Sequence, residues 1–158
     1  MPVVTVRPFN TFGPRQSARA VIPTIITQCL TADTVKLGNL TPTRDLNFVA
    51  NTVEGFLRAA SSDKAVGSTL NLGSGREISV GDLAQLIAKL VDRPVKVVCE
   101  EQRLRPEKSE VERLLACNKR ARDLLDWEPE VGLEEGLTRT IAWMRENQRR
   151  YRPGVYVV

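Results

Sequence analysis

The sequence predicts an α/β fold, in which short apolar strands alternate with amphipathic helices. The first observation is a run of β-branched residues, Val3, Val4 and Val6, which is typical of a strand buried on both faces. The second is that apolar residues recur at helical spacing in four later segments. The third is that residues 69–72 and 95–98 form further short apolar runs between those segments. Strands and helices are therefore expected to be mixed along the chain.

The composition limits the classes of protein to which the chain can belong. The 158 residues are about the size of one domain, and 42% hydrophobic with 27% charged residues is typical of a soluble globular protein. The chain has no His, which excludes His-based acid–base catalysis and zinc sites that need imidazole. Its three cysteines include no CxxC pair, so neither a disulfide scaffold nor a metal site is predicted, and a reducing cytoplasm is expected. No apolar run has the length of a membrane span or a signal peptide.

The chain has a net charge of +4, and five of its arginines lie in the last twenty residues. Such a tail can bind nucleic acid, but cations are also favoured at the exposed end of a helix. No nucleic-acid motif or aromatic platform accompanies these arginines, so the exposed helix end is the favoured interpretation. Neither a nucleic acid nor a membrane is predicted as a partner.

The first half of the chain contains two predicted helices. Residues 7–15 contain two prolines and a glycine, which favour a loop, and residues 35–38 indicate a short strand. Residues 41–44 are expected to form another loop. The apolar positions at helical spacing are Ile22, Ile25, Ile26, Cys29 and Leu30 in the first helix, and Val49, Val53, Phe56, Leu57 and Ala60 in the second.

The second half begins its helices with recognisable caps. Residues 79–82, Ser-Val-Gly-Asp, resemble a capping box with Asp in place of Glu. Asn118 is expected to cap a short helix that ends at Leu125. Residues 100–112 are highly charged with both signs mixed. The predicted core faces are Val80, Leu83, Leu86, Ile87 and Leu90 in one helix and Leu133, Leu137, Ile141 and Met144 in the last; Trp127 and Trp143 are expected to be core aromatics.

Residues 7–16, Arg-Pro-Phe-Asn-Thr-Phe-Gly-Pro-Arg-Gln, resemble the segment after the sixth strand of extended short-chain dehydrogenases, the NAD-dependent nucleotide-sugar epimerases and dehydratases. Further matches follow in the family's order. They are Ile-Pro at 22–23, Leu-Gly at 37–38 followed by Thr-Arg-Asp-Leu-Asn-Phe-Val at 43–49, Leu-Asn-Leu-Gly-Ser-Gly at 70–75, and Arg-Pro at 105–106 before Ala-Arg-Asp-Leu-Leu-Asp-Trp-Glu-Pro at 121–129. The chain departs from the family at Cys117, where the family usually has Asp.

The resemblance implies the C-terminal half of such an enzyme, most like a nucleotide-sugar 4,6-dehydratase. The implied division places remnant Rossmann segments at 1–16 and 66–76 and mainly substrate-binding domain at 17–65 and 77–158. The family's Gly-rich loop and its catalytic Tyr-x-x-x-Lys pair have no counterpart here, since neither Tyr151 nor Tyr156 has a Lys four residues later. This chain alone is therefore expected to be inactive, with no catalytic residue and no tight binding of NAD.

The resemblance also implies which residues touch ligands. Arg44 and Arg105 would bind the diphosphate of a nucleotide sugar, since Arg binds phosphate oxygens in pairs. The other implied contacts are Asn10 to phosphate or sugar, Leu37 and Gly38 to the base, Glu110 to the ribose, and Pro8 and Phe9 to nicotinamide. The substrate contacts each have a structural alternative: an ion pair of Arg44 with Asp45, solvated charges at Arg105 and Glu110, an amide at Asn10 that bonds its own loop, and an ordinary strand end at 37–38.

Two other functions stay open from the sequence. The chain could be the corresponding half of an epimerase or decarboxylase, or a standalone binding or assembly module without catalysis. We also expect self-association into a homo-oligomer, because Val3, Val4, Val6, Leu70 and Leu72 would belong to a sheet whose neighbouring strands are missing. A two-fold dimer is the commonest closed arrangement.

Overall fold

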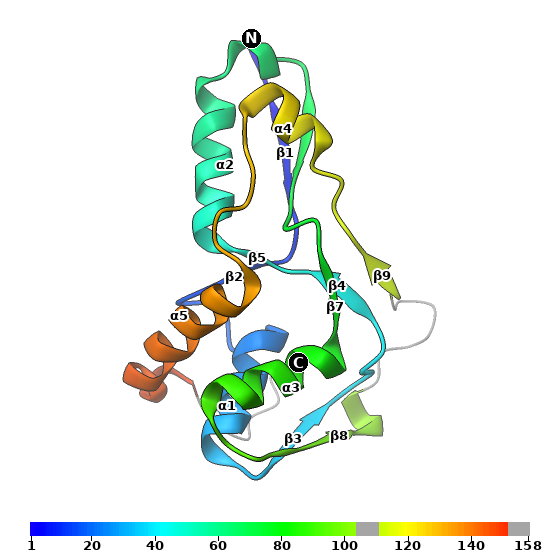
Figure 1. The fold of residues 1–158 in the computed structure, drawn as a ribbon, viewed down its shortest axis with the longest axis vertical. Helices are drawn as coiled ribbons and strands as arrows, with labels where there is room; N and C mark the ends of the chain where they lie inside the picture. Colours follow the sequence, from blue (N-terminus) through cyan, green and yellow to red (C-terminus); the bar gives the residue numbers. More distant parts are fainter. Residues whose placement is uncertain (104–110, 152–158) are drawn as a thin grey trace. The chain divides into compact units, whose positions relative to one another are not determined.

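The computed structural model describes residues 1–103 and 111–151 (Figure 1). Arg105 and Glu110 lie outside these residues. The chain divides into two compact units, each built from three segments. The first unit comprises Met1–Phe12, Thr43–Ile78 and Arg113–Leu133, and the second comprises Gly13–Pro42, Ser79–Glu112 and Glu134–Val158. The division into Rossmann remnant and substrate domain made from the sequence stays a prediction.

The first unit is built on two parallel strands, β1 (Thr5–Pro8) and β6 (Thr69–Leu72), with Val6 opposite Leu70. Helices α2 (Val49–Ser61) and α4 (Lys119–Leu125) pack against them (Figure 1). The expected burial of the first strand on both faces is wrong, because most of β1 is exposed and only the face of Val4 and Val6 meets the core. That core consists of Ala59, Ala65, Leu70, Leu72, Ala121, Leu125 and the fully buried Trp127.

Helix α2 forms where the sequence predicts it, but its buried face is the opposite of the expected one. Its buried residues are small or polar: Asn51, Thr52, Gly55 and Ala59. The predicted apolar stripe is exposed, with Val53 at 52%, Phe56 at 46% and Leu57 at 61%. Gly55 explains this orientation, because a Cβ there would lie 2.4 Å from Cδ1 of Leu72. The helix approaches the sheet through its smallest residues.

Short strands complete the first unit. β2 (Thr11–Phe12) pairs in parallel with β5 (Asn47–Phe48), and the rings of Phe12 and Phe48 meet edge to face. β4 (Thr43–Asp45) lies between β7 (Glu77–Ser79) and β9 (Arg113–Leu114) in a three-stranded sheet. The loop expected at 41–44 is therefore wrong from residue 43 onward. A one-turn helix, η1 (Asp63–Ala65), precedes β6.

The second unit pairs β3 (Thr34–Leu37) in parallel with β8 (Lys96–Cys99). Its helices are α1 (Val21–Thr31), α3 (Val80–Val91) and α5 (Leu133–Glu146), with single turns at η2 (Glu101–Arg103) and η4 (Gln148–Arg150). α1 packs against α3, and the predicted face of α1 is buried except that Leu30 is half-buried. In α3 the buried face includes Leu83 and Ile87, as predicted, while Val80, Leu86 and Leu90 are half-buried.

Two predicted caps have different outcomes. The Ser79 hydroxyl accepts a hydrogen bond from the backbone N–H of Asp82 at 3.0 Å, which confirms the N-terminal cap of α3. Asn118 occupies the N-cap position before α4, but its side chain makes no capping hydrogen bond to that helix. Its amide instead pairs with the backbone N–H and C=O of Gly73. Within the described ranges, no helix is long and apolar enough to cross a membrane.

Candidate functional site

A buried carboxylate organises the centre of the first unit. Asp45, at the end of β4, is fully buried. Its Oδ1 accepts hydrogen bonds from the backbone N–H of Ser74 at 2.6 Å and the Ser74 hydroxyl at 2.7 Å. Its Oδ2 accepts from the backbone N–H groups of Gly75 at 2.9 Å and Ala116 at 3.1 Å. These bonds give Asp45 a role other than a pairing with Arg44, the one role that the sequence indicates for it.

Gly73 is required by the same cluster. A Cβ at position 73 would lie 2.4 Å from Cβ of Ala116 and 2.7 Å from Oδ2 of Asp45, closer than atoms can approach. Ser74, in the turn after β6, bonds the same carboxylate through both its backbone N–H and its hydroxyl. The turn after β6, the end of β4 and the segment before α4 are thereby joined at one carboxylate.

One predicted substrate-binding residue, Asn10, bonds this cluster, and another, Arg44, is the sequence neighbour of Asp45 on β4. The side-chain amide of Asn10 donates to the backbone carbonyl of Asp45 at 3.1 Å, and the backbone carbonyl of Asn10 accepts from the N–H of Asn47 at 3.1 Å. The amide therefore bonds β4 rather than its own loop. Arg44 is half-buried and donates from Nη1 to the carbonyl of Thr43 at 2.8 Å. Because side chains alternate along a strand, Arg44 and Asp45 leave β4 on opposite faces.

Leu37 and Gly38 lie at the end of β3 in the second unit. Leu37 is buried, and its carbonyl accepts from the N–H of Glu100 at 2.8 Å. A Cβ at Gly38 would lie 2.4 Å from the backbone oxygen of Arg103, so glycine permits the close approach of η2. Arg103 and Lys36 both donate hydrogen bonds to the carboxylate of Glu100. These bonds, with that of Arg103 the larger effect, lower the pKa of the Glu100 carboxyl group. The strand end is thus held by an ionic cluster immediately before residue 104.

Pro8 and Phe9, the residues assigned to nicotinamide contact, have their polar backbone groups in use. The N–H of Phe9 donates to the carbonyl of Leu72 at 2.8 Å, and the carbonyl of Phe9 accepts from the Thr11 hydroxyl at 3.0 Å. This segment can offer a ring face to a cofactor, but it has no backbone donor left for a pyrophosphate. Pro8 and Phe9 by themselves therefore do not fit the binding of a whole dinucleotide.

A charged cluster holds the outer strands of the three-stranded sheet. The guanidinium of Arg113 on β9 donates two hydrogen bonds at 2.8 Å to the two carboxylate oxygens of Glu77 on β7. The Thr43 hydroxyl on β4 donates to the same carboxylate at 2.8 Å. These bonds, that of Arg113 first, lower the pKa of Glu77 to about 2. They tie β7, β4 and β9 together beside Arg44.

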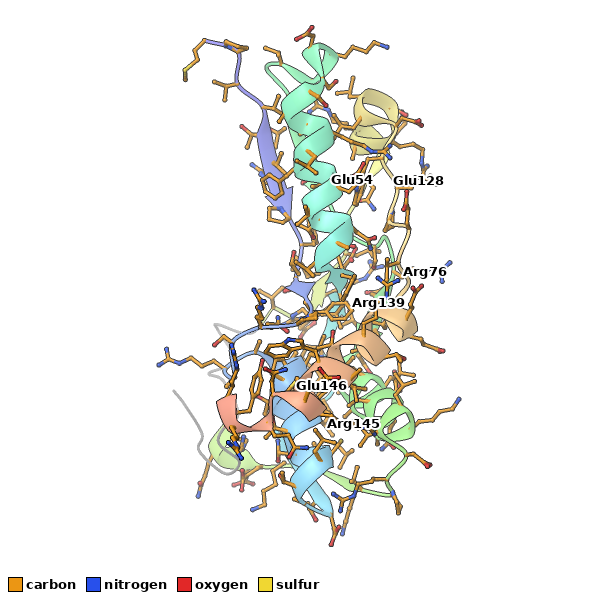
Figure 2. The ribbon with its side chains drawn as sticks, turned by 90° about the vertical axis from the view of Figure 1, so that its left-hand side faces the viewer. Glu54, Arg76, Glu128, Arg139, Arg145 and Glu146 are labelled. Carbon is orange, nitrogen blue, oxygen red and sulfur yellow. The ribbon has the colours of Figure 1, made fainter. Side chains whose placement is uncertain are left out.

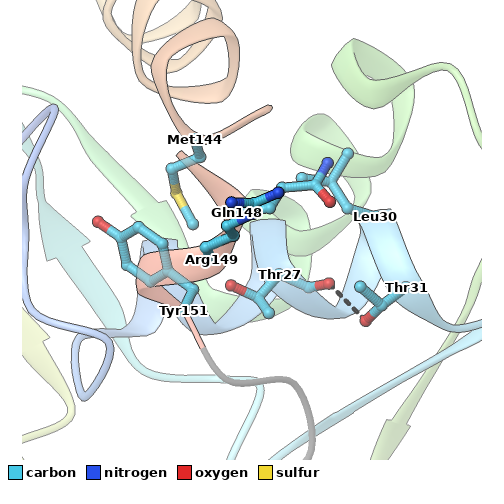
Figure 3. A pocket seen from close by; sticks show the side chains of 7 residues that line it. All are labelled: Thr27, Leu30, Thr31, Met144, Gln148, Arg149 and Tyr151. Atoms are coloured by element: carbon cyan, nitrogen blue, oxygen red, sulfur yellow. Dashed lines mark hydrogen bonds between the residues drawn. The ribbon is translucent and has the colours of Figure 1, made fainter. Parts of the chain in front are cut away.

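A groove of about 430 Å³ lies in the second unit between α1 and the end of α5 (Figure 3). Thr31 donates from its hydroxyl to the carbonyl of Thr27 at 2.8 Å, and Tyr151 donates to the carbonyl of Gln16 at 2.9 Å, so both hydroxyls are engaged. Among the described residues that line it, Arg149 supplies a guanidinium. The described part of its walls is largely apolar and includes no predicted site residue, so these walls do not present the paired cations that a diphosphate favours.

Comparisons with known proteins agree on one family. A family profile described as GDP-mannose 4,6 dehydratase matches residues 1–140. The UDP-glucose 4-epimerase of Mycolicibacterium smegmatis is 33% identical over 148 residues, which cover 91% of this chain and 46% of that protein. Other relatives are named UDP-glucuronic acid decarboxylase and GDP-6-deoxy-D-mannose reductase.

Solved structures of the same kind of protein share the fold of this chain. The epimerase Mth375 of Methanothermobacter thermautotrophicus superposes with a TM-score of 0.85 at 36% identity, over 95% of this chain and 45% of that one. MoeE5, described as a complex with UDP-glucuronic acid and NAD, gives a TM-score of 0.80 at 26% identity, over 90% of this chain and 46% of that one.

These matches confirm the predicted family and the α/β fold class. The chain spans about half the length of the relatives and structures that it matches. The expectation of NAD as the family's cofactor is confirmed by the MoeE5 complex. With a family profile matched over most of its length, the chain belongs to the GDP-mannose 4,6-dehydratase family of extended short-chain dehydrogenases.

Proposed function

We propose that the chain carries the nucleotide-diphosphate recognition of an NAD-dependent nucleotide-sugar enzyme, most like a 4,6-dehydratase. The observation that carries the proposal is the half-buried Arg44 on β4, whose neighbour Asp45 is held by four hydrogen bonds to its carboxylate and accepts the amide of Asn10 at its backbone carbonyl. A guanidinium on a strand that is fixed by a buried carboxylate is well placed to bind an anion, because its backbone does not need to be ordered on binding.

The proposed contacts follow the chemistry of the ligand. A diphosphate presents several anionic oxygens, and Arg binds them with charge-assisted hydrogen bonds worth about 1.5–3 kcal/mol each. We assign Arg44 and Arg105 to the diphosphate and Asn10 to the adjoining phosphate or sugar. In the second unit, Leu37 and Gly38 are proposed to contact the base through their backbone. Glu110 is proposed to bind the ribose, and Pro8 and Phe9 to touch the nicotinamide ring.

The reaction class is the finer part of the proposal. Among the relatives, an epimerase and a decarboxylase match as well as the dehydratase profile does. Recognition of a nucleoside diphosphate is common to these reactions, so the binding proposal does not depend on which one applies. The chain's sequence contains no Tyr-x-x-x-Lys pair, so in our proposal it supplies recognition rather than a catalytic group.

Titration calorimetry with UDP, GDP and dTDP tests the proposal. We expect binding of at least one of them, and Arg44→Ala should weaken it by about 10- to 100-fold, the equivalent of one charge-assisted contact. Arg120→Ala is the matched control, because it removes an exposed guanidinium of the same unit that bonds Ser68. Equal affinity in Arg44→Ala and Arg120→Ala would remove Arg44 from the site. Turnover of a nucleotide sugar by this chain with NAD would overturn the non-catalytic assignment.

A further inference from the structure

Polar side chains are buried around the segment that carries Asn10. In the part of the first unit that the structure describes, the buried polar residues lie on β4, on β5 and at the start of α2; they are Asp45, Asn47, Asn51 and Thr52. The core between β1, β6, α2 and α4 is apolar by contrast. Asp45 belongs to the carboxylate cluster, but the other three form a second network that the proposed function does not use.

This second network is a chain of hydrogen bonds between side chains. Nδ2 of Asn51 donates to Oδ1 of Asn47 at 3.0 Å, and Nδ2 of Asn47 donates to Oγ1 of Thr52 at 3.1 Å. Oγ1 of Thr52 lies 3.0 Å from Oγ1 of Thr11 on β2. The Thr11 hydroxyl donates to the backbone carbonyl of Phe9 at 3.0 Å, so the chain ends on the segment before β2.

The direction of each hydrogen bond in this chain is fixed. A hydroxyl group has one hydrogen, and that of Thr11 is used on the carbonyl of Phe9, so Thr52 must donate to Thr11. At the other end, Nδ2 of Asn51 also donates to the backbone carbonyl of Val131 at 2.9 Å, while its Oδ1 accepts from the N–H of Val131 at 3.0 Å. Because neither end can be reversed, the chain has one arrangement.

Asn10 lies where this chain ends. Phe9, whose carbonyl accepts the last hydrogen bond, precedes Asn10, and Thr11 follows it. Asn47 also holds Asn10 directly, since its backbone N–H donates to the carbonyl of Asn10 at 3.1 Å. The side-chain amide of Asn10 bonds the carbonyl of Asp45. Asn10 is therefore held at its backbone, at its side chain and through both of its neighbours.

Stability alone does not require amides and hydroxyls at these buried positions. Apolar groups of the same shape can replace both members of a buried hydrogen-bonded pair at little cost in stability. A fully bonded polar network instead fixes one arrangement of the side chains and backbone that it joins. A ligand-binding residue needs such support, because its contacts weaken when its position is not held.

We propose that Asn47, Thr52 and Thr11 are positioning residues, which hold Asn10 in its binding geometry before the ligand arrives. This proposal rests on the proposed function, because it takes Asn10 as a contact to the phosphate or sugar of a nucleotide sugar. The three residues act on the ligand only through Asn10. A contact that is ordered in advance loses less conformational entropy on binding, so the network strengthens the affinity.

Thr52→Val tests the proposal, because it keeps the shape of the side chain and removes its hydroxyl. Hydrogen exchange at the backbone N–H of Asn47, followed by nuclear magnetic resonance in the free chain, reports the bond to Asn10 without any nucleotide. We expect this exchange to become about 10-fold faster, the equivalent of one lost hydrogen bond. The N–H of Thr5 in the β1–β6 sheet is the internal reference and should keep its exchange rate. Thr52→Ser retains the hydroxyl and should restore the slow exchange.

The same variants are then titrated with UDP, GDP and dTDP. We expect Thr52→Val to weaken nucleotide binding by about 3- to 10-fold with an unchanged circular dichroism spectrum, and Thr52→Ser to recover it. Ser61→Ala is the matched control, because it removes an exposed hydroxyl of the same helix that donates to the carbonyl of Leu57 at 3.1 Å. It should change neither the exchange at Asn47 nor the affinity.

Three results would overturn the proposal. The first is an unchanged exchange rate at Asn47 in Thr52→Val. The second is an equal acceleration at Asn47 and Thr5, which would make the network a general stabiliser of the unit. The third is faster exchange at Asn47 with full affinity for the nucleotide.

A failure of the proposed function is distinguishable from these results. If the wild-type chain binds none of the three nucleotides, the proposed function is overturned, and the exchange at Asn47 still decides whether the network holds Asn10. If Thr52→Val does not fold, Thr11→Val breaks the same chain at β2 and has the same expected outcome.

Discussion

The carboxylate of Asp45 accepts a hydrogen bond from the backbone N–H of Ala116, seventy-one residues further along the chain, at 3.1 Å. With the bonds from Ser74 and Gly75, this contact joins three separate segments of the first unit. The same residue's backbone carbonyl holds the amide of Asn10. Asp45 therefore fixes the frame on which Arg44 and Asn10 are presented.

Replacing this carboxylate should strongly destabilise the protein. In Asp45→Asn the side chain loses its charge. Its NH₂ group is a donor and would face backbone N–H donors, so no hydrogen bond can form between them. A hydrogen bond to a charged group contributes about 1.5–3 kcal/mol, and a buried donor left without an acceptor costs about 1–3 kcal/mol. We expect the free energy of unfolding to fall by about 3 kcal/mol, measured by urea denaturation.

The matched control is Asp123→Asn, which removes an exposed carboxylate paired with Lys119 on α4. Exposed ion pairs contribute about 0–1 kcal/mol, so this variant should unfold close to the wild-type urea concentration. If the two substitutions cost the same, the Asp45 cluster does not stabilise the first unit in the way its geometry indicates.

Spacing in the sequence predicted the helices and the four-residue strands β1, β3, β6 and β8, because these depend on local periodicity, but not the two- and three-residue strands. It did not predict which face of α2 is buried, since the apolar stripe at Val53, Phe56 and Leu57 competes with the close fit of Gly55 against Leu72. It also missed β4, because the strands that pair with it lie far away in the chain.

The candidate site was predicted only through the family resemblance. Asn10 bonds the backbone of Asp45 in the first unit, and Arg44 precedes Asp45 on β4, but no pattern in the sequence predicts that the Asp45 carboxylate holds this strand end. A buried carboxylate bonded to backbone N–H groups leaves no periodic pattern. The one available signal was the small-residue run Gly-Ser-Gly at 73–75, which supplies donors that only a tertiary contact can satisfy.

A single methyl group at position 73 should also destabilise the first unit. Gly73→Ala places its Cβ against Ala116 and Asp45, which are both buried and cannot move without breaking the cluster. Overpacking of this kind costs about 1–3 kcal/mol. Gly132→Ala is the control, because a Cβ there meets no atom within 4 Å. We expect it to be neutral or slightly stabilising in the same urea titration. A stable Gly73→Ala variant would contradict the packing described here.

The Glu77–Arg113 pair should give stability that is lost in acid. Arg113 and Thr43 lower the pKa of Glu77 to about 2, from a usual value of 4.5. Because the pKa of Glu77 is lower in the folded state, its ionisation stabilises the folded protein at any pH above about 4.5, the usual pKa. This contribution disappears as the pH falls from about 4.5 to about 2. Glu77→Gln should therefore lower the melting temperature at pH 7, and the difference from wild type should vanish near pH 2.

Calorimetric melting at low salt measures this difference. Arg113→Gln should have the same effect as Glu77→Gln, and the double variant should cost no more than either one, since both remove the same contact. Glu146→Gln, an exposed carboxylate on α5 (Figure 2), serves as the control and should leave the pH profile unchanged. Additive losses from the two substitutions would show that the pair does not act as a unit.

The three cysteines should differ in their reactivity toward a thiol reagent. Cys29 is fully buried in α1, and burial raises the pKa of its thiol to about 11, with a smaller opposite effect of Arg93. Cys99 and Cys117 are exposed. Because the thiolate is the reacting form, Cys29 is protected both sterically and by its ionisation. At pH 8 we expect two thiols to react with DTNB within seconds, and the third to react only as fast as the protein unfolds. The variant with Cys99→Ser and Cys117→Ser isolates Cys29 and should show no fast phase until urea is added. A fast reaction of that variant in buffer would mean that α1 opens readily, and that the second unit lacks the packed core described here.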